Sequence, residues 1–170
     1  MKRSNKCTFK NVAFYAACFA FTVALFVALA AAGHVYPFGD NSFLASDLKY
    51  QYIDFFAWFR RVLLGEENLR YSFSQGLGMN TWGLYSYYLA SPFNLLCVLF
   101  PQDKLTLFVF VITALKLGCI HISSAWFLQK RFGLPKPAAF LLSLSFTFCS
   151  WTISNLRNPL WIDCLILLPI

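Results

Sequence analysis

Charged residues are scarce in this chain, and acidic residues are the scarcest of them. Only 12% of the 170 residues are charged, with 14 Lys or Arg against 7 Asp or Glu. Soluble domains average roughly 25% charged residues. The chain is instead 59% hydrophobic and 19% aromatic. This balance excludes an ordinary soluble domain and predicts a chain of membrane spans and loops.

Histidine and paired cysteines are also lacking. The chain has 2 His, far apart at His34 and His121, and 6 Cys with no CxxC pair and no zinc-type spacing. Most of the cysteines lie in apolar runs, where a thiol acts as a small hydrophobe; they are Cys7, Cys18, Cys97, Cys119, Cys149 and Cys164. We therefore expect no metal site built from Cys and His.

The net charge of +7 does not come from a basic patch on a soluble core. The basic residues instead flank apolar runs; they are Lys2, Arg3, Lys6 and Lys10 before the first run, and Lys130, Arg131 and Lys136 between two later ones. Such flanks are typical of cytoplasmic segments. They argue against a nucleic-acid partner. A nucleotide-phosphate loop is not expected either, because no strand precedes the Gly-x-Gly of residues 74–80.

What the chain does contain is apolar runs long enough to cross a bilayer. Residues 12–32 form the first expected span, after a cytoplasmic N-terminus at 1–11. A cleaved signal peptide is the alternative, because residues 28–30 (ALA) resemble a cleavage site. The run is longer than the apolar region of a signal peptide, which favours an uncleaved span.

Two more spans are expected at 105–128 and 138–154, joined in the cytoplasm by the basic segment 129–137. With the end of the first span outside and the basic segment inside, only one crossing fits between them. The apolar stretch 82–100 then does not span. Its Tyr, Ser and Asn content suits a helix on the outer leaflet. A true span there, with the basic segment outside, is the alternative.

These assignments predict an all-α polytopic membrane protein. Residues 33–104 form one large extracytoplasmic loop with interfacial helices at about 47–64 and 82–100. Residues 155–163 return outside, and residues 164–170 begin a truncated fourth span. Because the chain stops within that apolar run, we expect the front piece of a longer protein, inactive alone.

One amphipathic segment of the loop, ASDLKYQYIDFFAWFRR, combines polar and aromatic side chains. Ser46 can cap a helix that starts at Asp47, and Gly65 can end it. Three- and four-residue steps place on one face Asp47, Tyr50, Gln51, Asp54, Trp58 and Arg61. In the first turn the helix dipole favours an ionised Asp47, which can accept a proton from a hydroxyl. The face is either catalytic or a solvated surface.

Lys116 lies near the middle of the second span, where a cation costs roughly 2.5–3.5 kcal/mol on insertion scales. It must therefore face other helices or a polar cavity. A structural ion pair with a carboxylate beyond this chain and contact with a lipid phosphate are equal alternatives. A transporter with Lys116 and Asp163 along its pathway is another hypothesis, although neither an internal repeat nor paired broken helices are visible. His121 is expected to pack between helices.

Three stretches resemble the N-terminal part of the YfhO family of bacterial membrane proteins: SDLKYQYIDFFAWFRR, YSFSQGLGMNTWGLYSYYLASPFNLL and NPLWIDCLILLP. The resemblance runs nearly end to end and implies only the first part of a larger polytopic protein of the bacterial plasma membrane. The family is placed with glycosyltransferases of the GT-C architecture. It thus implies a GT-C-like N-terminal module whose large first extracytoplasmic loop carries interfacial helices.

The resemblance also implies an activity. A sugar would pass from a polyprenyl-phosphate-linked donor to a cell-envelope acceptor, such as a teichoic-acid-like polymer, with inversion at the anomeric carbon. Asp47 would be the catalytic base, with Asp40 as the runner-up. The cations that could hold the departing phosphate are Arg61, Lys116 and Arg157, and the other substrate-binding candidates are Tyr50, Gln51, Asp54 and Asp163. No cofactor is implied with certainty, and a divalent metal stays open because only some GT-C enzymes use one. A non-catalytic membrane module is the remaining alternative.

Overall fold

The computed structural model describes residues 2–170, with side chains from residue 11 onward. The side chains of the N-terminal basic flank and of Cys7 therefore lie outside the description. In chain order the elements are α1 (Lys2–Ala32), η1 (Leu48–Tyr52), α2 (Ile53–Leu63), β1 (Tyr71–Ser72), β2 (Met79–Asn80), α3 (Trp82–Leu84), η2 (Tyr85–Leu89), η3 (Pro92–Leu99), η4 (Gln102–Lys104), α4 (Leu105–Phe132), α5 (Lys136–Thr147), α6 (Ser150–Ser154) and α7 (Pro159–Leu167).

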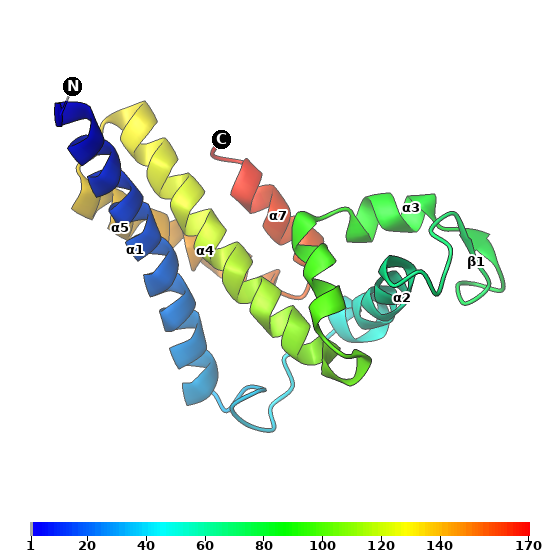
Figure 1. Ribbon diagram of the computed structural model, residues 1–170. Helices are drawn as coiled ribbons and strands as arrows, with labels where there is room; N and C mark the ends of the chain where they lie inside the picture. The colour runs from blue at the N-terminus through cyan, green and yellow to red at the C-terminus, as the bar shows by residue number, and fades with distance from the viewer. Residues whose placement is uncertain (1) are drawn as a thin grey trace.

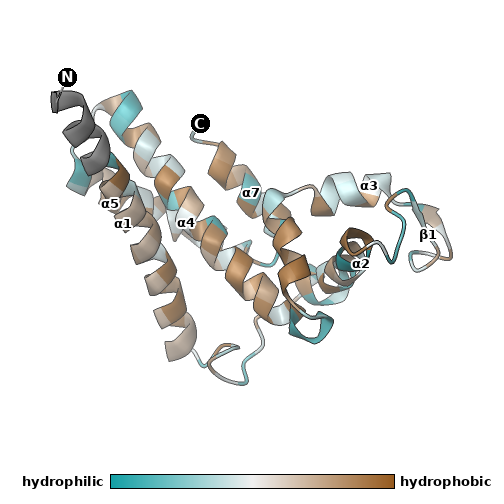
Figure 2. Ribbon diagram, in the orientation of Figure 1, coloured by the Kyte–Doolittle hydropathy of each residue, from teal (hydrophilic) through white to brown (hydrophobic). Residues whose placement is uncertain are grey.

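A bundle of long helices makes up one part of the molecule. The segments Asn11–Ala32, Gln102–Phe132 and Lys136–Ser154 are each long and apolar enough to cross a membrane. α1 lies beside α4, and both α5 and α7 pack against α4 (Figure 1). Hydrophobic residues dominate α1, α4 and α7, and hydrophilic ones gather where α4 ends (Figure 2). The expected class, an all-α membrane protein, is confirmed.

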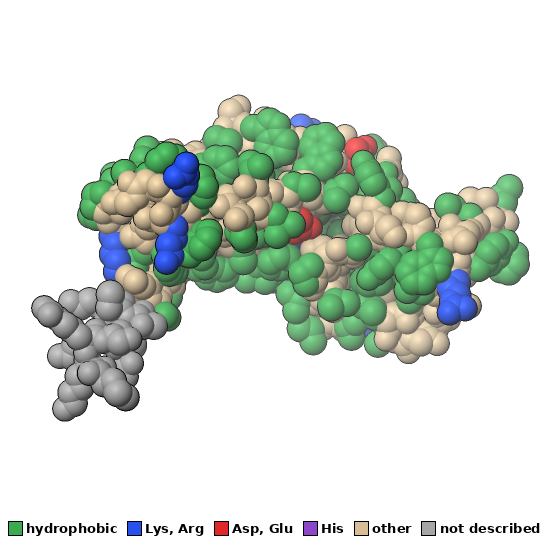
Figure 3. Space-filling view, turned by 90° about the horizontal axis from the view of Figure 1, so that it is seen from above, with side chains coloured by type: hydrophobic (Ala, Val, Ile, Leu, Met, Phe, Trp, Pro, Cys, Tyr) green, Lys and Arg blue, Asp and Glu red, His purple; other side chains and the backbone are tan. Residues whose placement is uncertain are grey.

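α4 is the central helix of this bundle, with buried side chains along most of its length. His121 of α4 is fully buried and joins three helices. Its Nδ1 lies 2.6 Å from the Thr22 hydroxyl of α1, and its Nε2 lies 3.2 Å from the Phe140 carbonyl oxygen of α5. The helix ends at Gly133, whose left-handed φ of +63° lets the chain turn toward α5. Basic side chains gather at this end (Figure 3), where Lys130 and Arg131 occupy the last turn of α4.

Residues 48–104 form the second part of the molecule, which we call the loop unit. It extends from the start of α4 to the right in Figure 1. Apolar side chains of α2, η2, η3 and the first turns of α4 share one core; among them are Tyr52, Phe56, Phe59, Leu89, Cys97, Leu105 and Phe108. The loop unit is therefore fixed to α4 by a core of its own rather than lying loosely on a membrane surface.

The helix expected at 47–64 differs from expectation at its beginning. It opens with the π-helical turn η1, and Ser46 does not cap it, because its φ is +51° and no side-chain capping bond forms. A π-turn holds more residues than an α-turn and shifts the faces of the helix that follows. Trp58, expected on the polar face, is consequently 1% exposed and part of the core.

The end of that helix is as expected. Gly65 has a φ of +81°. Its N–H donates to the Val62 carbonyl at 3.1 Å, and the N–H of Glu66 donates to the Arg61 carbonyl at 2.9 Å. These paired bonds are those of a Schellman cap, which satisfies carbonyls that would otherwise lack partners.

The stretch 82–100 is not one helix. The first piece, α3 with η2, ends at Leu89, and the second piece, η3, begins at Pro92. Proline lacks an N–H and forces the residue before it into an extended conformation; Ser91 accordingly has φ −115° and ψ 135°. The third expected span is likewise interrupted, between α5 and α6. The side of the membrane that each loop faces stays a prediction.

A short β-hairpin was not expected. β1 and β2 pair antiparallel, with Tyr71 opposite Asn80 and Ser72 opposite Met79. The hairpin projects from the loop unit at the end farthest from α1 (Figure 1). At its base the Thr81 hydroxyl donates a hydrogen bond to the Leu69 carbonyl.

Candidate functional site

Asp47 stands at the N-terminal boundary of η1, where its side chain is exposed. It does not cap the helix, and it forms no ion pair within residues 11–170. An exposed carboxylate without a cationic partner is free to take up a proton from a neighbouring group. Such exposure is required of a general base, and it is shared by solvated surface carboxylates.

Tyr52, in the same helical turn as Asp47, lies close to α7. The ring is 2% exposed, and its hydroxyl lies near the backbone of Leu160 in the first turn of α7. Burial raises the pKa of the Tyr52 phenol above its usual range, and the neighbouring Tyr88, Tyr87 and Asp47 raise that pKa further. Tyr52 is therefore a neutral phenol at physiological pH, buried in the core of the loop unit near the start of α7.

Lys116 and Asp163 form an ion pair between α4 and α7. The Nζ of Lys116 lies 2.9 Å from a carboxylate oxygen of Asp163 and donates a second bond, 3.0 Å long, to the Pro159 carbonyl. The Lys116 side chain is 1% exposed and that of Asp163 is 23% exposed. Nζ also lies 5.6 Å from the centre of the Phe93 ring. The expected structural pair exists, but its carboxylate belongs to this chain.

A polar pocket of about 410 Å³ lies along the exposed face of η1 and α2. It brings together three of the candidates, Tyr50, Asp54 and Arg61, with residues that sequence reasoning missed; these are Ser74 and Gln75 of the hairpin loop and Gln102 before α4. Gln51 points elsewhere, because its side-chain oxygen accepts a 3.3 Å bond from the Tyr88 hydroxyl. Carboxylate, amide and hydroxyl groups in one pocket suit a ligand rich in hydroxyl groups.

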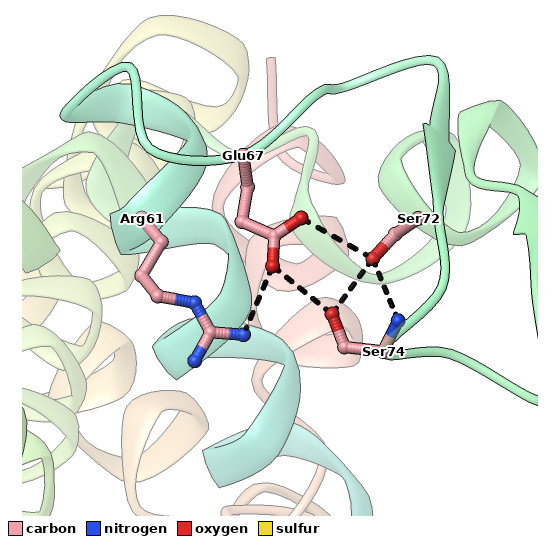
Figure 4. Close-up of polar contacts among 4 residues, drawn as sticks. All are labelled: Arg61, Glu67, Ser72 and Ser74. Atoms are coloured by element: carbon pink, nitrogen blue, oxygen red, sulfur yellow. Dashed lines mark hydrogen bonds and ion pairs between the residues drawn. The ribbon is translucent and has the colours of Figure 1, made fainter.

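Arg61 is bound to a neighbour rather than free for a phosphate. Its Nη2 lies 3.5 Å from Glu67, and the same carboxylate accepts a 3.1 Å bond from Ser74 and a 3.5 Å bond from Ser72 (Figure 4). The two serine hydroxyls are 2.8 Å apart. A larger groove of about 930 Å³ borders this cluster between the end of α2 and the hairpin. Nothing in the sequence paired Arg61 with Glu67, because the pair depends on how the chain returns after Gly65.

A comparison with protein families identifies a family for most of the chain. The model of the family described as bacterial membrane protein YfhO matches residues 17–170. The chain belongs to the YfhO family. Searches of curated proteins and of solved structures returned no match. The family resemblance seen in the sequence is thereby confirmed.

Two further candidates of this YfhO chain lie in exposed turns. Asp40 is exposed in the turn after α1, and Arg157 is exposed between α6 and α7. Neither lines the polar pocket, and Asp47, the candidate base, does not line it either. Within the part of the chain that is described, no group of three or more His, Cys, Asp or Glu side chains could hold a metal ion.

Burial raises the pKa of the Cys97 thiol to about 11, so this cysteine of the YfhO loop unit is not a nucleophile at neutral pH.

Proposed function

We propose that this YfhO chain is the N-terminal part of an integral-membrane glycosyltransferase of the bacterial plasma membrane. It takes a sugar from a polyprenyl-phosphate-linked donor and passes it to a cell-envelope acceptor on the extracytoplasmic face, with its N-terminus in the cytoplasm. The observation that carries the proposal is the exposed, unpaired carboxylate of Asp47 at the start of the loop unit, on the same helical segment as a polar pocket.

The reaction is a direct displacement with Asp47 as general base. Asp47 takes the proton of the acceptor hydroxyl, and the acceptor oxygen forms a bond to the anomeric carbon. The bond between that carbon and the phosphate oxygen breaks, and the polyprenyl phosphate leaves with the electron pair. Inversion follows because the acceptor attacks opposite the leaving group. The exposed position of Asp47 supports its role, because an exposed carboxylate without an ion-pair partner can meet the hydroxyl of an acceptor.

The polar pocket supplies the binding surface for the hydroxyl groups of the substrate. Asp54 accepts hydrogen bonds, and the amides of Gln75 and Gln102 both donate and accept them. The ring of Tyr50, which is 73% exposed, adds an apolar face. Among the cations first considered for the phosphate, Arg157 is the one that we retain, since Lys116 and Arg61 are engaged with carboxylates.

The test is sugar transfer by membranes that carry the chromosomally encoded protein with Asp47→Asn. The amide cannot accept the proton, so transfer of radiolabelled sugar from the lipid-linked donor should fall by about 10²–10⁴-fold, the range of general-base catalysis. Immunoblots must show an unchanged amount of protein in the membrane.

The matched controls are Asp40→Asn and Asp103→Asn, two other exposed carboxylates of the same loop. Both should leave transfer unchanged. Undiminished transfer by Asp47→Asn removes Asp47 as the base, and loss of transfer by Asp40→Asn alone would assign that role to the runner-up. No transfer by the unaltered protein would favour a non-catalytic membrane module.

A further inference from the structure

The β-hairpin has two chemically different faces. Along β1 and the residues after it, Ser72 is 2% exposed, whereas Tyr71 and Phe73 are 45% and 80% exposed. Successive side chains of a strand point to opposite sides, so Ser72 and Ser74 share one side while the two rings share the other. The rings contact each other edge to face, with centroids 5.1 Å apart.

The polar side is fastened to the rest of the loop unit. Glu67 accepts hydrogen bonds from Ser74 at 3.1 Å and from Ser72 at 3.5 Å, and its charge is paired with Arg61 of α2 (Figure 4). The backbone N–H of Ser74 also donates to the Ser72 hydroxyl at 3.2 Å. Because these bonds fix the serine side toward α2, the aromatic side must face outward.

The tip of the hairpin holds an apolar side chain in an unfavourable backbone conformation. Gly76, Leu77 and Gly78 have φ values of +53°, +69° and +107°, and Leu77 is 100% exposed. Leucine is disfavoured at positive φ, and such strain tends to occur at functional positions. The φ of +107° at Gly78 favours glycine there, and a Cβ would also lie 2.5 Å from the Tyr71 hydroxyl oxygen.

We propose that the outward side of the hairpin inserts into the lipid surface on the side of the membrane where the loop unit lies. The inserting surface, which we call the hairpin patch, consists of Tyr71, Phe73, Leu77 and Trp82, each at least 45% exposed. The proposal does not depend on the sugar-transfer reaction.

The partner is lipid because of the composition around the patch. No charged residue occurs between Arg70 and Asp103, and this uncharged segment leads directly into the membrane helix that begins at Gln102. The patch has Phe and Leu at the tip and Tyr and Trp nearer the base. This order suits a membrane interface, where apolar side chains enter the lipid and the amphipathic rings of Tyr and Trp lie at headgroup depth. Arg70 at the base is placed to meet anionic headgroups. A site for a soluble partner would ordinarily have a polar and charged rim.

The test replaces Phe73 or Leu77 with the photo-crosslinker benzoylphenylalanine. The encoded protein is reconstituted in vesicles of phosphatidylethanolamine and radiolabelled phosphatidylglycerol and then irradiated. Labelled lipid should become attached to the chain at position 73 and at position 77. The control is the same replacement at Asn68, which is exposed in the loop before the hairpin but outside the patch, and which should give no lipid adduct.

A second pair of variants separates insertion from misfolding. In the protein labelled at position 73, Leu77→Asn removes the apolar tip with a residue that tolerates positive φ, and lipid attachment should drop. Leu77→Met, which keeps the tip apolar, should retain it. Attachment of position 73 to protein instead of lipid, or equal lipid attachment at position 68, would overturn the proposal. Sugar transfer that is lost while lipid attachment persists bears on the proposed function alone.

Discussion

Asp47 directly precedes η1 and Asp163 lies in α7, and the two carboxylates differ in their surroundings. Asp163 lies 2.9 Å from Lys116, whereas Asp47 is exposed and has no cationic partner among the side chains described. A carboxylate oxygen that is bound to an ammonium group is occupied and is not free to meet a substrate hydroxyl. Asp163 is therefore suited to holding α7 on α4, and Asp47 to taking up a proton.

The ion pair allows a prediction at this scale. Lys116→Met leaves Asp163 without its cation in a largely buried position, and one carboxylate oxygen of Asp163 already lacks a hydrogen-bond partner. Removing one member of a buried pair costs about 3–5 kcal/mol. We expect a clearly lower midpoint of thermal unfolding in detergent, measured by the amount of protein that stays monodisperse after heating.

The control for this prediction is the double variant Lys116→Met with Asp163→Leu. Apolar replacement of both members of a buried pair is often neutral or stabilising, so the unfolding midpoint should recover toward that of the unaltered chain. A single variant as stable as the unaltered chain would mean that the pair contributes nothing to holding α7.

At the scale of elements, the sequence predicted what depends on local chemistry. The prediction that Gly65 ends a helix needed only the backbone freedom of glycine. The prediction that His121 packs between helices needed only its place within a long apolar run. The burial of Trp58 and the partner of Lys116 were not predictable in this way. The first depends on the phase shift introduced by η1, and the second on α7 folding back against α4. The alternation of YSFS did carry a strand signal, but it is too short to be distinguished from a loop.

The crossing of α1 and α4 gives the element-scale prediction. A Cβ on Gly118 of α4 would lie 2.5 Å from the ring of Phe19 in α1. Small residues at such contacts let membrane helices approach closely. Gly118→Val should force the helices apart and destabilise the bundle by about 1–3 kcal/mol, the usual cost of overpacking. Thermal unfolding in detergent measures the loss.

Gly83→Ala provides the matched control for the helix crossing, because an added Cβ there meets nothing within 4 Å. Gly83 lies in α3, away from the bundle, and alanine is the better helix former. This variant should unfold at the same temperature or slightly higher. Equal unfolding of Gly118→Val and Gly83→Ala would show that Phe19 moves aside without cost.

At the scale of the whole molecule, the loop unit and the membrane bundle share α4. The apolar core of the loop unit includes the first turns of α4, and the basic residues Lys130 and Arg131 lie at its other end. Composition was enough to predict the spans, because length and apolarity are properties of single segments. The attachment of the loop unit to α4 was not predictable, since it rests on contacts between distant segments. Because α4 is long and apolar enough to cross a bilayer, we predict that its two ends lie at opposite faces of the membrane.

That separation is tested by cysteine labelling of intact cells, in a chain whose native cysteines are replaced. A cysteine at Glu66, which is exposed in the loop unit, should react with a membrane-impermeant maleimide added outside. A cysteine at Phe132, which is 62% exposed at the end of α4, should react only after the cells are permeabilised. Phe132 is preferred to Gly133 because the left-handed φ of +63° at Gly133 disfavours cysteine. Reaction of both cysteines from outside would contradict this prediction. It would require a second crossing between them, which residues 82–100 would provide. It would also place Lys130 and Arg131 outside, whereas basic residues are normally enriched in cytoplasmic loops.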